Sequence, residues 1–140
     1  LAVPRQRGGP PPPTYAGALA SLGLNLLRQS KWPEAETVLR ECLALREKQA
    51  PDEWTTSNTK SMLGGALLGQ KKYADAEPLL LAGHEGVKKQ EAKIPPQGQV
   101  RIPEAIERLV QLYEATGNKE EAARWQHELE KQKPPPPDKP

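Results

Sequence analysis

Few residues of this sequence could carry out chemistry, and their spacing assembles no site. The chain has two histidines, His84 and His127, and one cysteine, Cys42. The His84-Glu85 pair is not followed by a second histidine one helical turn later, which a zinc protease motif would require. One cysteine and two distant histidines also lack the spacing of a metal-ligand set. We therefore predict no metal site and expect both histidines to lie on the surface.

The cysteine, the glycine pairs and the acidic pairs indicate packing and solvation rather than catalysis. Cys42 lies at a small-residue position of an apolar helical stripe, which favours a buried spacer over a nucleophile. Gly64-Gly65 and the 83–86 stretch lack the Lys-Ser/Thr ending of a phosphate-binding loop. Acidic pairs such as Glu120-Glu121 fit solvated helix faces, not the shielded cleft of acid–base catalysis. We expect a chain without catalytic residues or a cofactor.

Composition and charge restrict the partners of the chain. Twenty basic and 18 acidic residues give a formal net charge of +2, which creates no strong field for nucleic acid or an anionic membrane. The apolar runs are too short to span a bilayer. With three Trp, three Tyr and no Phe, a shallow stacked core of Leu and Ala is favoured over one deep core. We expect no nucleic acid partner, no membrane, and a cytoplasmic location.

Apolar residues recur at helical spacing through most of the chain, and no alternating strand pattern is present. Turn residues divide the stripes into helical hairpins near residues 15–49, 53–93 and 103–133. Proline-rich ends flank them, and proline disfavours helix interiors. The sequence thus predicts a tail or linker over 1–13, a helical domain over 14–133 and a tail over 134–140. The tails could serve as plain linkers or as SH3-type ligands.

The hairpins repeat one another. Residues 32–36 match 73–77, and residues 120–123 provide a third copy, so that Ala35, Ala76 and Ala122 lie 41 and 46 residues apart. Small residues at these positions let two helix backbones approach closely, and we expect the three alanines at the tightest helix contacts. One hairpin cannot bury its stripe alone, so neighbouring hairpins must stack.

These residues resemble the tetratricopeptide repeat over roughly residues 14–133. The stretch from Leu43 to Lys48 and the following Pro51-Asp52 are similar to the second helix and turn of the kinesin-light-chain-like subclass. The second half is similar to the closing segment of repeat arrays in large bacterial multidomain proteins. The resemblance implies an all-α solenoid of about three hairpins, or six helices, that serves as a protein interaction scaffold. The alternative is the C-terminal regulatory repeat segment of a larger bacterial signalling enzyme, such as a serine/threonine protein kinase.

In this family, ligands lie in a concave groove lined by the first helix of each repeat. The clamp that some members use for C-terminal carboxylates requires Lys and Asn where this chain has Ala20, Leu24 and Glu104, and only Arg108 agrees. The glutamates of the third hairpin suggest a basic or mixed ligand, with a solvated face as the alternative. The resemblance places the following residues toward the groove: Leu24, Arg28, Asn58, Ser61, Gly65, Glu104, Glu107, Arg108, Gln111 and Glu114.

Three further expectations concern individual segments. Trp54 lies where the chain enters the second hairpin, and we interpret it as a plug of that junction rather than a ligand anchor. An RNA-binding solenoid is the third functional hypothesis, and it is disfavoured because the chain lacks a basic, aromatic-lined face. The opening helix is apolar on nearly every side around Leu24. We therefore expect the C-terminal end of a longer repeat protein and possible self-association of the isolated fragment.

Overall fold

The computed structural model of the chain describes residues 13–132. Over this range all regular elements are helical, which confirms the predicted all-α class. The predicted tails lie outside the described residues, except that Pro13 is the first residue of the first helix. The elements are α1 (Pro13–Arg28), α2 (Trp32–Gln49), α3 (Trp54–Gly69), α4 (Tyr73–Lys89), α5 (Arg101–Thr116) and α6 (Lys119–Gln132), with short 3₁₀ helices at Glu91–Lys93 and Pro96–Gly98 between α4 and α5.

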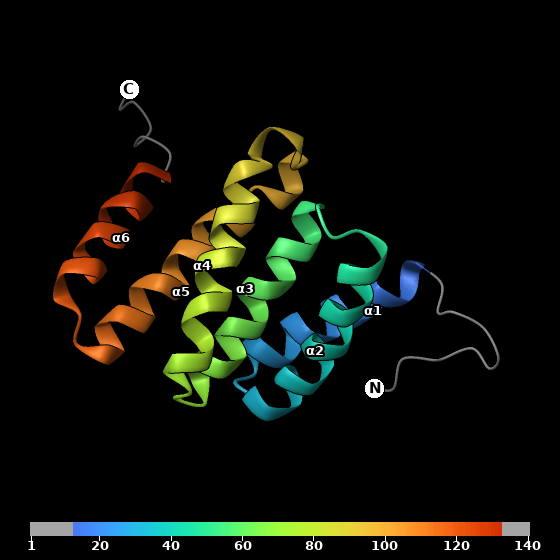
Figure 1. Cartoon of the computed structure of the whole chain (residues 1–140), viewed down its shortest axis with the longest axis horizontal. Coiled ribbons are helices and arrows are strands. Elements are labelled where there is room, and N and C mark those ends of the chain that lie inside the picture. The colour runs from blue at the N-terminus through green and yellow to red at the C-terminus, as the bar shows by residue number, and fades with distance from the viewer. Residues whose placement is uncertain (1–12, 133–140) are drawn as a thin grey trace, which may run out of the picture.

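The helices pair into three hairpins that lie side by side, with α1–α2 at one end and α5–α6 at the other (Figure 1). Within each hairpin the two helices pack together, and each second helix also packs against the first helix of the next hairpin. In addition, α3 contacts both α1 and α5. The first helices α1, α3 and α5 therefore form one layer, and the second helices α2, α4 and α6 form the other.

The turn inside each hairpin has the same backbone geometry. A residue in the left-handed region ends the first helix at equivalent positions: Ser30 with φ 58°, Lys71 with φ 63° and Gly117 with φ 79°. The next amide donates back across the turn, from Lys31 to the carbonyl of Leu26 and from Lys72 to that of Leu67, each at 2.9 Å. Asn118 does the same to Tyr113 at 2.9 Å. This pattern is the Schellman motif of helix C-termini, and its recurrence shows that the sequence repeat is a structural repeat.

Small residues lie where the helices of a hairpin approach each other, glycines as well as the predicted alanines. Ala35 and Ala76 are completely buried, whereas Ala122 is only half-buried, because α6 has a neighbour on one side alone. The backbones of α3 and α4 approach most closely at Gly83, where an added Cβ would lie 2.7 Å from the amide nitrogen of Ser61. Gly64 leaves a similar space for Leu80.

The junction between the second and third hairpins is filled by Trp54. An added Cβ at Gly98 would lie 2.9 Å from the Trp54 ring, so only glycine lets the 91–100 segment close over the indole. Gln99 fastens this segment by donating to the carbonyls of Ile94 at 2.8 Å and Glu91 at 3.2 Å. Trp54 packs against the hydrophobic core and acts as a plug, but it does so between the second and third hairpins rather than at the entrance to the second hairpin, where the sequence suggested it.

The opening helix is covered better than its composition suggested. Leu24 and Leu26 pack against the core, and in the described part of the chain the exposed large hydrophobic side chains are Leu81 and Val100, neither of which lies on α1. The exposed patch expected around Leu24 is therefore small, and self-association stays a prediction. None of the described helices has the length and apolarity needed to cross a bilayer.

Candidate functional site

A cleft of about 480 Å³ opens on the layer of first helices. Residues from α1, α3 and α5 make its walls and floor, and the aromatic residues that begin α2 and α4 close one end. We call this the concave cleft. Its lining consists of Leu24, Leu27, Arg28, Trp32, Gly65, Leu68, Gly69, Tyr73, Glu104, Glu107, Arg108, Gln111 and Ala115.

Most of the predicted groove residues lie in this cleft, and three do not. Asn58 and Ser61 are buried at 7% and 0% exposure, because α3 is packed on by α1, α2, α4 and α5 together. Glu114 is exposed but lies outside the lining. The predicted residues that line the cleft are Leu24, Arg28, Gly65, Glu104, Glu107, Arg108 and Gln111.

The aromatic end of the cleft was not predicted as part of a binding surface. Trp32 and Tyr73 occupy equivalent positions at the start of α2 and α4. The indole of Trp32 packs directly against Gly69, where an added Cβ would collide with the ring. Both aromatic residues are nevertheless half-buried and line the cleft. Their aromatic character at the first turn of the second helix was the signal that could have found them.

Arg108 lies at the base of the cleft with an unusual environment for a charge. Its Nη1 donates to the hydroxyl of Ser61 at 2.9 Å, and its side chain lies against Gly65, where an added Cβ would be 3.1 Å from Nε. No carboxylate of the described residues lies within 4.0 Å of the guanidinium. Burial lowers the pKa of Arg108, partly opposed by the charge of Glu104. An unpaired guanidinium keeps donors free for a planar anion.

Of the other charged residues of the cleft, one has an ion-pair partner and two do not. Glu104 is neutralised by Arg101, whose Nη1 donates to its Oε1 at 2.7 Å. Glu107 and Arg28 are exposed and form no ion pair within the described range. The uncompensated lining charges are therefore Arg28 and Arg108 against Glu107. This balance differs from the acidic wall expected from the glutamates of α5, because one glutamate is paired and Glu114 lies outside.

The residues with catalytic or metal-binding potential lie elsewhere and do not converge. Cys42 is buried, donates to the carbonyl of Ala16 at 3.3 Å, and has a pKa raised by burial. Cys42 is therefore the buried, small residue between α1 and α2 that the sequence predicted. Within residues 13–132 no group of three or more His, Cys, Asp or Glu side chains could hold a metal ion.

The two predicted surface histidines differ in exposure. His127 is exposed, but His84 is half-buried because its ring packs edge-on against Trp125, with ring centroids 4.7 Å apart. Burial lowers the pKa of His84 below its ordinary value of 6.5. The imidazole is thus neutral at physiological pH and acts as a packing group between α4 and α6.

Comparison with known proteins identifies the first hairpin. The family model of the tetratricopeptide repeat matches residues 16–48, which cover most of α1 and α2. The second and third hairpins reproduce the turn geometry of the first, as described above. The match suggests the kinesin-light-chain-like subclass only loosely. No curated protein matched the chain.

Proposed function

Because this chain contains a tetratricopeptide repeat and stacks three hairpins of that kind, we propose that it is an interaction scaffold that binds a segment of a partner protein in the concave cleft. Such repeats generally mediate protein–protein interaction, and the family is typically non-catalytic. The cleft combines apolar side chains with charged and polar ones in its lining, and a ligand site needs both, for contact area and for orientation.

The observation that carries the proposal is the half-buried Arg108 at the base of the cleft, which has no carboxylate partner among the described residues. A carboxylate placed there would gain charge-assisted hydrogen bonds from a guanidinium that now has only the Ser61 hydroxyl as partner. Arg28 on the α1 wall adds a second uncompensated positive charge, whereas Glu107 opposes it. We therefore propose that the bound segment carries an acidic residue toward the arginines.

The apolar part of the cleft defines the rest of the ligand. Leu24 and Leu27 on α1 face the cleft together with Leu68 on α3, and all three belong to or pack against the core. Leu24 and Leu68 are half-buried, and leucines that are partly accessible in a cleft are suited to contact an apolar anchor side chain. The partner segment is thus expected to combine an apolar anchor with a neighbouring carboxylate.

The test is a selection of random peptides on the intact chain, followed by affinity measurements on variants. Arg28→Glu should weaken the selected peptides by about tenfold or more, because it replaces an attraction with a repulsion. Lys48→Glu makes the same charge change at an exposed position of α2 outside the cleft and is the matched control. An equal effect of both substitutions, or none of either, would contradict binding in the concave cleft.

A further inference from the structure

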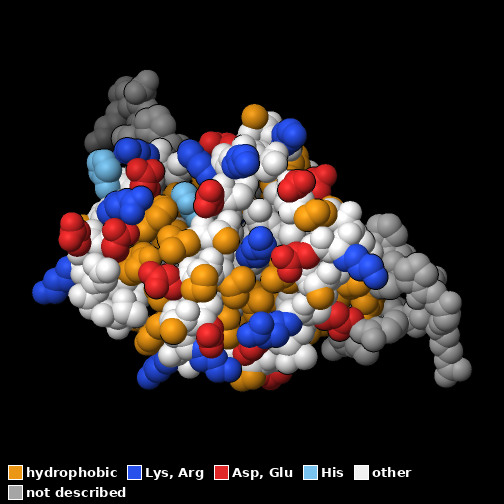
Figure 2. Space-filling model, in the orientation of Figure 1, with side chains coloured by type: hydrophobic (Ala, Val, Ile, Leu, Met, Phe, Trp, Pro, Cys, Tyr) orange, Lys and Arg blue, Asp and Glu red, His pale blue; other side chains and the backbone are white. Residues whose placement is uncertain are grey.

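A second hollow lies in the other layer, between α4 and α6. It encloses about 700 Å³, and we call it the α4–α6 furrow. Hydrophobic side chains are exposed between these two helices, with basic and acidic side chains around them (Figure 2). Its lining consists of Leu81, His84, Glu85, Lys88, Lys89 and Trp125.

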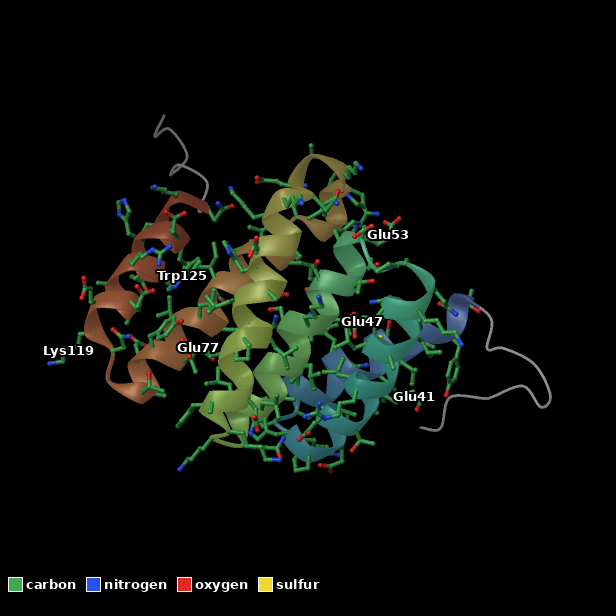
Figure 3. The ribbon with its side chains drawn as sticks, in the orientation of Figure 1. Glu41, Glu47, Glu53, Glu77, Lys119 and Trp125 are labelled. Carbon is green, nitrogen blue, oxygen red and sulfur yellow. The ribbon has the colours of Figure 1, made fainter. Side chains whose placement is uncertain are left out.

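The floor of the furrow is an aromatic pair. Trp125 projects from α6 toward α4 (Figure 3), where its ring meets His84 at a 4.7 Å centroid distance and a 78° angle. Arg124 adds a cation–π contact, with Cζ 5.1 Å from the Trp125 ring centroid. The buried Nε1 of Trp125 has no hydrogen-bond acceptor among the described residues. The pair is therefore held in place by packing, with an indole donor left unsatisfied.

The first two hairpins provide an internal comparison for this floor. A shift of 41 residues places Leu43 at the position of His84, and a shift of 46 places Leu79 at that of Trp125. Leu43 is buried and Leu79 packs against the same core cluster, so both equivalent positions hold aliphatic side chains in the core. Packing of the solenoid alone thus does not require a histidine and a tryptophan at the α4–α6 interval.

The residues at the rim of the furrow also differ from their equivalents in the first hairpin. Leu81, 37% exposed, takes the position of Arg40, an exposed arginine that pairs with Glu36 at 2.7 Å. Lys88 takes the position of Glu47, which reverses the charge there. Relative to the first interval, the furrow has gained an exposed apolar side chain, an aromatic floor and a basic end.

The basic end is available to a ligand. Lys88 pairs with Glu91 at 3.1 Å, but both side chains are more than 40% exposed, so the pair is weak and exchangeable. Lys89 forms no ion pair within the described range. Glu85 is the one acidic residue of the lining, against the two lysines. Leu81 and Lys88 lie seven residues apart on one helix, or about 10 Å along its axis.

We propose that the α4–α6 furrow is a second docking site, which binds an extended segment of a partner protein that carries a bulky apolar side chain and, three residues later, a carboxylate. The apolar side chain lies over Leu81 and the aromatic pair. The carboxylate lies at Lys88 and Lys89, since three extended residues span about 10 Å. This site is separate from the concave cleft and does not depend on ligand binding there.

The test removes the proposed site by replacing two furrow residues with the residue types found at the equivalent positions of the first hairpin. Random eight-residue peptides are selected on the intact chain and counter-selected on the double variant Leu81→Arg/Lys88→Glu, which installs the residue types of Arg40 and Glu47. Both positions are exposed, and equality of the two melting temperatures checks the fold. The matched control, Arg40→Leu/Glu47→Lys, changes the first interval and should retain the furrow peptides within about twofold.

The three tryptophans show where each peptide binds. In a ¹⁵N spectrum, the indole signal of Trp32 reports the concave cleft, that of Trp54 the hairpin junction and that of Trp125 the furrow. Peptides that the double variant loses should share an apolar residue followed three residues later by Asp or Glu. They should bind at least tenfold more weakly to the double variant. On the intact chain they should shift the indole signal of Trp125 alone. Absence of such peptides, basic consensus residues, or shifts at Trp32 instead would overturn the proposal. If no peptide binds in the concave cleft, the proposed function fails, but the result for the α4–α6 furrow still stands.

Discussion

The close approach of α3 and α4 makes Gly83→Ala a demanding test of the packing. The added Cβ would lie 2.7 Å from the nitrogen of Ser61 and 2.9 Å from the carbonyl oxygen of Ser57. Both are backbone atoms, so no rotamer change relieves the contact and the helices must separate. Overpacking costs about 1–3 kcal/mol, and two backbone contacts place this variant in the upper part of that range, at about 2–3 kcal/mol. The better helix propensity of alanine offsets roughly 1 kcal/mol. We predict a net loss of about 1–2 kcal/mol in the free energy of unfolding.

Gly17→Ala is the matched control, because an added Cβ on α1 would meet nothing within 4 Å. Without a clash, only the helix propensity remains, and the free energy of unfolding should rise by about 0.5–1 kcal/mol. Urea titrations followed by far-UV circular dichroism measure both variants. Melting temperatures should move in opposite directions, by roughly 3–5 °C per kcal/mol. If Gly83→Ala is as stable as the unaltered chain while Gly17→Ala is stabilised, the inferred helix contact is wrong.

Three further predictions concern single side chains. Lys71→Gly should raise the free energy of unfolding by about 1 kcal/mol, because Lys71 has a φ of 63° that costs a non-glycine residue energy; an unchanged urea midpoint would refute this. Because burial lowers the pKa of His84, the unfolded chain takes up that proton first, so stability should decrease as the pH falls below 6.5. His84→Leu, the residue type of Leu43, should flatten this part of a stability–pH profile, and an identical profile would count against it. Arg108→Met should keep or raise stability, since a desolvated, unpaired charge is removed, while it weakens peptides bound in the concave cleft; a loss of stability above about 1 kcal/mol would assign Arg108 a structural role.

The repeat could be predicted from the sequence because its determinants are local. Helical periodicity and the alanines 41 and 46 residues apart located the hairpins, and the turn residues Ser30, Lys71 and Gly117 follow the same spacing. Helix bounds came within a few residues for the same reason. Local patterns also identified Cys42 as a spacer, since its position in the stripe of α2 fixes which way it points.

The charge of the cleft could not be predicted in this way. Whether Glu104 faces a ligand or pairs with Arg101 depends on rotamers of two neighbouring side chains. The burial of Asn58 and Ser61 depends on four helices that pack around α3. Sequence analysis assigned these residues by alignment with a general groove, and an alignment does not contain the packing of this particular helix.

The α4–α6 furrow was missed for a different reason. His84 and Trp125 belong to different hairpins, and neither side chain by itself indicates that the two rings meet. The repeat itself contained the signal, because the aligned positions Leu43 and Leu79 are aliphatic. Comparison of equivalent positions across intervals, rather than within one hairpin, would have revealed the aromatic pair.

The location of a bound peptide in the chain tests the proposed function most directly. A peptide selected on the intact chain and lost on Arg28→Glu is titrated into the ¹⁵N-labelled protein, and the three tryptophan indole signals are followed to saturation. Binding in the concave cleft predicts a saturable shift of Trp32, which lines the cleft, with Trp54 and Trp125 unmoved. A shift confined to Trp125, or saturable binding that leaves Trp32 unchanged, would contradict the concave cleft as the partner site.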